Sequence, residues 1–283
     1  MLALAPKTVY IHEPFNINNS DVIESSFINW FQYVCEENSC QHKEELRKIF
    51  TYYYPLRFNL SKARSFRDIK KIARDQSKLL YYRANSYTPI VKDPIAVFSA
   101  GWLSETFNMN VLVMIRHPAA FCSSLKLKGW KYDFSNFLKQ PLLMKQFLKK
   151  FEDDIREYAA NEKDIISQAI LLWNCIHHTV NIYKDKYPEW IFVKHEELSS
   201  DPVAQFRKIY ASLNLEFTPK AQSCILDSSS AHNPTEQVSG NEFIRNSKAN
   251  IYNWKNRLTL TEIERIKEST IDISKLFYTK YEW

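Results

Sequence analysis

The segment NVLVMIRHPAAFCSSLK, residues 110–126, says most about the fold. Its first six residues include five apolar side chains, a pattern typical of a short strand buried on both faces of a parallel sheet. Pro118 fits the first position of a helix that continues through Ser124. The segment therefore predicts a strand followed at once by a helix, with Arg116 where the strand ends.

The rest of the chain repeats this alternation. Further strands are expected at 8–12, 88–94 and 189–195. The apolar spacing predicts helices over 21–38, most of 43–83, 95–107, 141–158 and 164–186. Asp201 before Pro202, and Thr259 with Glu262, have the spacing of helix caps. We therefore expect one domain over residues 1–283, an α/β fold with a central parallel sheet flanked by helices.

Composition limits the kind of protein. The chain is 45% hydrophobic and 25% charged, which is typical of a soluble globular protein. Its formal net charge of +6 favours an anionic ligand but is too small to indicate nucleic-acid binding. The odd number of scattered cysteines favours reduced thiols, and no window is long enough to span a membrane. These features predict a cytoplasmic protein, if Met1 is the true start.

Polar, titratable residues follow each predicted strand, where ligands bind in parallel α/β sheets. They are His12 and Glu13, Lys92 and Asp93, Arg116 and His117, and Lys194, His195 and Glu196. Arg116 and Ser124 together are suited to hold one phosphate, because a guanidinium fork and a hydroxyl both donate hydrogen bonds to it. The alternative is an arginine paired with a local carboxylate and a serine that only packs.

The stretch RHPAAFCSS resembles the 3′-phosphate-binding segment of sulfotransferases that use 3′-phosphoadenosine 5′-phosphosulfate. In that family an apolar strand ends in Arg-(any)-Pro, and a serine follows eight residues after the arginine. Four other stretches are similar to segments of the carbohydrate-type members, in the same order. They are YIHEPFN, IVKDPIAVF, VKHEELSSDPVAQFRKIYASLNL and FIRNSKANIYNWKNRLTLTEIERI.

The resemblance implies a P-loop-NTPase-like three-layer fold and a role for each matching residue. Arg116 and Ser124 would hold the 3′-phosphate of the donor, and Arg245 and Lys248 would close over it. Glu13 is the first candidate for the base that takes the acceptor's proton, with His12 as runner-up, and Lys92 would stabilise the leaving phosphate. Each also has a structural alternative: an ion pair for Glu13, a solvated strand end for Lys92, and surface charges for Arg245 and Lys248.

One family element has no counterpart in the sequence. Members carry a first strand and a Gly/Ser/Thr-rich phosphate loop before the glutamate-proline segment, but no glycine precedes Gly101 here. Backbone N–H groups of such a loop grip the 5′-phosphosulfate. Three explanations stay open: a start codon assigned too late, a shortened chain, or a remnant that no longer catalyses. The first two are favoured, because the other site residues are present.

Two hypotheses from different classes follow. The first is an enzyme that transfers a sulfuryl group from the donor to a hydroxyl of a carbohydrate or small metabolite. The second is a non-catalytic nucleotide-binding or interaction module derived from a sulfotransferase. No metal is implied, since Cys35, Cys40 and His42 lack the spacing of a zinc site. The acceptor and the oligomeric state stay open.

Overall fold

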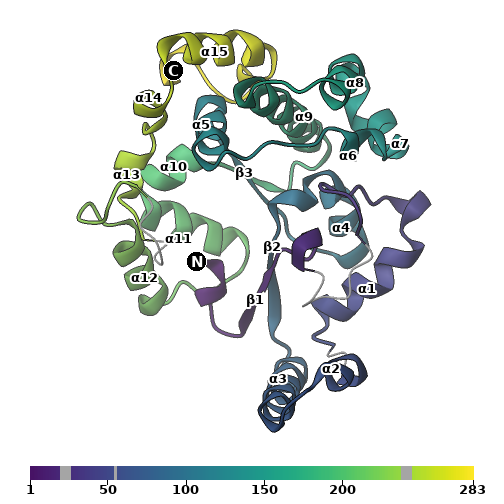
Figure 1. Ribbon diagram of the computed structural model, residues 1–283. Helices are drawn as coiled ribbons and strands as arrows, with labels where there is room; N and C mark the ends of the chain where they lie inside the picture. Colours follow the sequence, from purple (N-terminus) through teal and green to yellow (C-terminus); the bar gives the residue numbers. More distant parts are fainter. Residues whose placement is uncertain (20–26, 54–55, 237–243) are drawn as a thin grey trace. The chain divides into compact units, whose positions relative to one another are not determined.

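The chain, drawn in Figure 1, divides into two compact units. The computed structural model describes residues 1–19, 27–53, 56–236 and 244–283. The smaller unit spans Leu2–Trp102, and the larger spans Leu103–Trp283 together with Met1. Both contain helices and a short parallel sheet, so the mixed α/β class is confirmed.

The smaller unit is built on one parallel pair of strands. Strands β1 (Thr8–His12) and β2 (Thr88–Lys92) pair in register, with His12 opposite Lys92. The connection between them contains η2 (Ile17–Asn19), η3 (Glu36–Asn38), α1 (Cys40–Phe50), α2 (Leu56–Lys62) and α3 (Phe66–Ala84). The 3-10 helix η1 (Leu2–Leu4) precedes β1. After β2 come η4 (Pro94–Ser99) and the start of α4 (Ala100–Phe107). The helices expected over most of 43–83 and over 95–107 are confirmed in this form.

The larger unit contains the second parallel pair, β3 (Leu112–Ile115) and β4 (Ile191–Lys194), with Ile115 opposite Lys194. Between the strands lie α5 (Pro118–Lys128), α6 (Ser135–Leu138), α7 (Pro141–Leu143), η5 (Met144–Leu148), η6 (Lys149–Phe151), α8 (Glu152–Ala160) and α9 (Ile165–Lys186). After β4 come α10 (His195–Ser200), α11 (Pro202–Ser212), α12 (Pro219–Ser229), α13 (Ser247–Asn250), α14 (Trp254–Arg257), α15 (Leu260–Ser274) and η7 (Lys280–Glu282). The helix expected over 141–158 is interrupted by the π-helical η5.

The strands differ from the sequence-based expectation in two respects. The described residues pair as two two-stranded sheets instead of one central sheet. The expectation that residues 110–115 form a strand buried on both faces is also wrong, because 47% of Met114 is exposed. In the described part of the chain, β3 pairs with β4 alone and each has four residues, so helices supply most of the core.

The helix predicted over 21–38 is a second correction. Residues 20–26 lie outside the described ranges, and residues 27–35 are not helical. Phe27, Phe31 and Val34 are nevertheless buried, so the apolar pattern marks core positions on an irregular chain. The buried hydroxyl of Ser99 explains how this segment is held without helical hydrogen bonds. It accepts from the Val34 backbone N–H at 2.8 Å and donates to the Gln32 carbonyl at 2.7 Å.

Helix α5, which follows Arg116, is fixed in the middle of the larger unit. It packs against α9, α14 and α15, as Figure 1 shows for α9 and α15. Ala119 and Cys122 of α5 and Trp173 of α9 are fully buried at this contact. Small side chains on α5 let the helices approach closely, which explains the Ala-Ala-Phe-Cys-Ser-Ser composition after Pro118.

The capping box predicted at Thr259 is confirmed and yields a first prediction. The Thr259 hydroxyl accepts from the Glu262 N–H at 3.2 Å, and Glu262 accepts from the Thr259 N–H at 2.8 Å. Thr259→Ala should lower the free energy of unfolding by about 1 kcal/mol, measured by urea denaturation. Thr261→Ala, two residues further along the exposed first turn, is the control and should change it by less than about 0.5 kcal/mol. Equal effects of both variants would contradict the assignment.

Candidate functional site

Arg116 directly follows β3 and is held by its backbone. Its carbonyl accepts a hydrogen bond at 2.9 Å from the indole N–H of Trp173, which is fully buried in α9. The guanidinium makes neither an ion pair nor a hydrogen bond with the described residues, and its Nε is buried without a partner. Arg116 is half-buried as a whole, but a buried N–H without an acceptor costs free energy, so the guanidinium lacks hydrogen-bond partners that it could use.

The charges of two more arginines of the larger unit act on Arg116. Burial lowers the pKa of Arg116, the positive charges of Arg257 and Arg245 lower it further, and Glu196 opposes the shift. The Nε of Arg245 is likewise buried without a partner among the described residues. Arg257 differs, because its guanidinium pairs with Glu236. Two guanidinium groups, those of Arg116 and Arg245, are therefore left with unused donors in one charged cluster.

The first two residues of α10, His195 and Glu196, also belong to this region. Burial lowers the pKa of His195 to about 4, and the charges of Arg116 and Arg245 act in the same direction, so this imidazole is neutral at pH 7. Glu196 accepts hydrogen bonds at 3.0 Å from the His117 backbone N–H and the Tyr278 hydroxyl. Glu196 forms no ion pair with Arg116 or Arg245 in the described structure, so its charge only partly offsets theirs.

His117 directly precedes α5 and caps it, because its Nδ1 accepts from the Ala119 N–H at 3.3 Å. The His117 ring stacks on Trp254, and burial lowers its pKa to about 4. The helix carries Ser124 half-buried, two turns from its start, as the sequence predicts. No direct contact between Ser124 and Arg116 is present in the described structure, so their joint use as one phosphate site stays a prediction.

The two C-terminal candidates differ in their surroundings. The Arg245 backbone N–H donates to the Ser228 carbonyl at 3.0 Å, and α13, which follows, packs against α10. This arrangement carries Arg245 to the end of β4. Lys248, three residues later in α13, is exposed and forms no ion pair with a described residue. Of these two predicted residues, Arg245 acts electrostatically on Arg116, and Lys248 lies at the surface.

The smaller unit brings together Glu13, His12 and Lys92. The Glu13 backbone N–H donates to the Lys92 carbonyl at 2.9 Å, because β1 and β2 end in register. The carboxylate pairs with the Lys92 ammonium and accepts from the Asn16 amide at 2.8 Å. His12 Nε2 lies 3.9 Å from Glu13 Oε2, and His12 Nδ1 is 2.9 Å from the Tyr10 hydroxyl.

The ion pair with Lys92 makes Glu13 a weaker base, because it lowers the pKa of the carboxyl. Partial burial by itself would raise the pKa of Glu13, but the hydrogen bonds from Lys92 and Asn16 outweigh it and the pKa is lowered. Its backbone is also strained, with a φ of +42°, in the left-handed region that few non-glycine residues occupy. Asp93 stabilises the turn by accepting from the Phe15 N–H at 2.7 Å, and burial raises the pKa of Asp93 to about 6.

The sequence did not predict a role for Arg257, or the hydrogen bonds of Glu196 with the His117 N–H and the Tyr278 hydroxyl. Arg257 stands in the basic segment before Glu262, but no spacing rule connects it with Arg116. Only the packing of α14 on α5 brings them together. No group of three His, Cys, Asp or Glu suited to a metal ion occurs within the described ranges. Nor does any helix there have the length and apolar character needed to cross a membrane.

No protein-family model, curated protein or solved structure matches the chain.

Proposed function

We propose that the protein binds 3′-phosphoadenosine 5′-phosphosulfate and transfers its sulfuryl group to a hydroxyl of a carbohydrate or small metabolite. One observation carries the proposal: in the larger unit, Arg116 and Arg245 both have a buried Nε without a partner, and the charge of Arg245 acts on Arg116. A dianionic phosphate would supply the missing acceptors, since each guanidinium can donate two parallel hydrogen bonds to it. The P-loop-NTPase-like arrangement belongs to the same proposal.

The chemistry would need positioning, charge stabilisation and a base. The acceptor oxygen attacks sulfur as the bond from sulfur to the 5′-phosphate oxygen breaks, and 3′-phosphoadenosine 5′-phosphate leaves. Arg116, Arg245 and Ser124 hold the 3′-phosphate, and Lys248 closes over it. By resemblance, Lys92 balances the charge on the leaving oxygen, and Glu13, or else His12, takes the proton.

The test uses three adenine nucleotides in isothermal calorimetry. Adenosine 3′,5′-bisphosphate should bind at least tenfold more tightly than adenosine 5′-phosphate, because only the former offers a 3′-phosphate to the arginines; tenfold is about 1.4 kcal/mol. Adenosine 2′,5′-bisphosphate has the same charge in a different position and should bind more weakly than the 3′ isomer. Equal affinity for the two bisphosphates would contradict a specific 3′-phosphate site, because it would show that the protein attracts anions only through charge.

The alternative is a binding module without turnover, and the ion pair between Glu13 and Lys92 favours it. A carboxylate whose pKa is lowered accepts a proton poorly near neutral pH. Release of 3′-phosphoadenosine 5′-phosphate from the donor, measured with a panel of sugars, separates the two functions. Turnover that Glu13→Gln abolishes and His12→Ala preserves would assign the base to Glu13, and the reverse would assign it to His12. Tight nucleotide binding without turnover would support the function of a binding module.

A further inference from the structure

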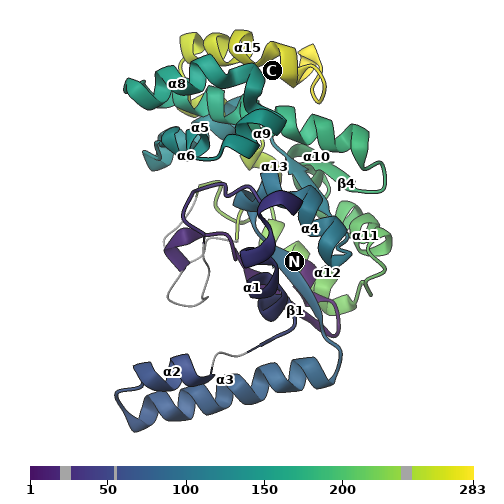
Figure 2. The same ribbon diagram turned by 90° about the vertical axis from the view of Figure 1, so that its right-hand side faces the viewer.

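Helix α3 of the smaller unit has little of its surface covered. It is 19 residues long, and Ile72 is its one buried residue. The short helix α2 packs along it, and Figure 2 shows the two side by side. Residues 62–83 contain eight lysines and arginines against two aspartates, a net charge of +6. This equals the net charge of the whole chain, so the positive excess is concentrated on α3 and the turn before it.

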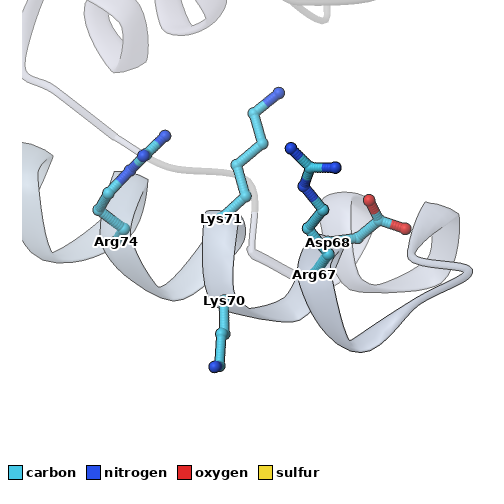
Figure 3. A pocket seen from close by; sticks show the side chains of 5 residues that line it. All are labelled: Arg67, Asp68, Lys70, Lys71 and Arg74. Carbon is cyan, nitrogen blue, oxygen red and sulfur yellow. The ribbon is translucent and has the colours of Figure 1, made fainter.

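The first half of α3 is rich in cations. Figure 3 shows the side chains that line a shallow hollow there: Arg67, Asp68, Lys70, Lys71 and Arg74. Lys70 extends to one side of the helix, while Arg67, Lys71 and Arg74 extend to the other. Of the four cations, Arg74 has an ion pair, with its neighbour Asp75 at 3.4 Å. The remaining three form none within the described residues, so their charge is available to an external anion.

Large apolar side chains are exposed beside these cations. They are Phe66, Ile69, Leu80 and Tyr81, with exposed fractions of 71%, 47%, 54% and 55%. At about 100° per residue, they occupy one sector of the helix, with Lys70 inside it. The Lys70 ammonium lies 4.9 Å from the centre of the Phe66 ring. Asp68 and Asp75 fall on the opposite side, so the exposed apolar sector is bordered by cations and free of acids.

This combination distinguishes between two kinds of anionic partner. A linear polyanion would need the cations but would gain little from four exposed apolar side chains. The headgroup region of a bilayer uses both, because apolar groups enter the acyl boundary while lysine and arginine extend to lipid phosphates. We propose that α3 docks the protein on the surface of a bilayer that contains anionic lipids. Its apolar sector lies in the headgroup region, and Arg67, Lys70 and Arg74 contact the phosphates.

Vesicle sedimentation with the full chain tests the proposal. We expect binding to phosphatidylcholine vesicles that contain about 30% phosphatidylglycerol and little binding to pure phosphatidylcholine. Lys70→Glu with Arg74→Glu should lower the partition coefficient at least tenfold. Lys208→Glu with Lys220→Glu makes the same change of charge at exposed sites on α11 and α12, and should lower it much less. Circular dichroism verifies that each variant remains folded.

A second variant decides between lipid and polyanion. Phe66→Ser with Leu80→Ser keeps every charge and should weaken vesicle binding at least fivefold while leaving heparin binding unchanged. Unchanged vesicle binding by this variant, with heparin binding lost in the charge-reversed variant, would make α3 a polyanion site and overturn the proposal. Equal binding to neutral and anionic vesicles, or none to either, would also overturn it. None of these outcomes depends on nucleotide binding by the larger unit.

Discussion

Replacing Arg116 by methionine should weaken adenosine 3′,5′-bisphosphate binding by about tenfold to a hundredfold, the loss expected for a charge-assisted pair of hydrogen bonds. The same variant should leave the nucleotide-free protein as stable as the wild type, or more stable. The reason is that Arg116 has a pKa lowered by burial and by two neighbouring arginines, and no ion pair of its own in the described structure. Removing its charge relieves repulsion within the cluster.

The combination of weaker nucleotide binding with unchanged or higher stability distinguishes a binding role of Arg116 from a structural one. If Arg116 serves only the fold, its loss should destabilise the free protein, because a structural partner would be left unpaired. Arg116→Lys keeps the charge but loses the planar fork, so it should retain stability and lose most of the affinity. Arg156→Met is the control: this exposed arginine pairs with Glu152, and its loss should change neither quantity by more than a few tenths of a kcal/mol.

Acid should destabilise the larger unit through its buried histidines. His117 and His177 are 2% and 4% exposed, and burial lowers the pKa of each to about 4. In the unfolded chain both return to about 6.5. Between pH 6.5 and 4 the unfolded state therefore binds more protons, so stability falls as the pH falls through this window. At pH 5 each histidine should cost about 2 kcal/mol relative to pH 7.5.

The variant His117→Asn tests this origin of the pH dependence. Asparagine keeps an acceptor for the Ala119 N–H at the start of α5 but does not titrate. It should lower stability at pH 7.5 by leaving a cavity, yet lose less on going to pH 5 than the wild type does. His232→Asn, at an exposed site, should keep the wild-type slope. Urea denaturation at both pH values measures the difference, and parallel pH profiles for His117→Asn and wild type would refute the explanation.

The local elements around the site could be predicted from the sequence. The strand before Arg116, the helix that begins at Pro118 and the cap at Thr259 all follow from residues close together in the chain. Hydrogen bonds within one helix turn and the restricted φ of proline do not depend on distant contacts. The same holds for the pairing of Glu13 with Lys92, since Glu13 follows one short strand and Lys92 ends the next, where polar residues are expected in a parallel sheet.

Where side chains from distant segments meet was decided by the tertiary structure. The charges of Arg245 and Arg257 act on Arg116 because α13 packs on α10 and α14 packs on α5, and neither contact can be predicted from residue spacing. Segment 27–35 is a case in which the sequence pattern gave the wrong conformation. Its apolar spacing suits a helix, but hydrogen bonds to the Ser99 hydroxyl hold it in an irregular form. Periodicity reports which side chains are buried, and the partners available to the backbone decide its conformation. The sequence by itself thus determined the strand–helix units and their polar ends, while packing alone determined which charges share one site.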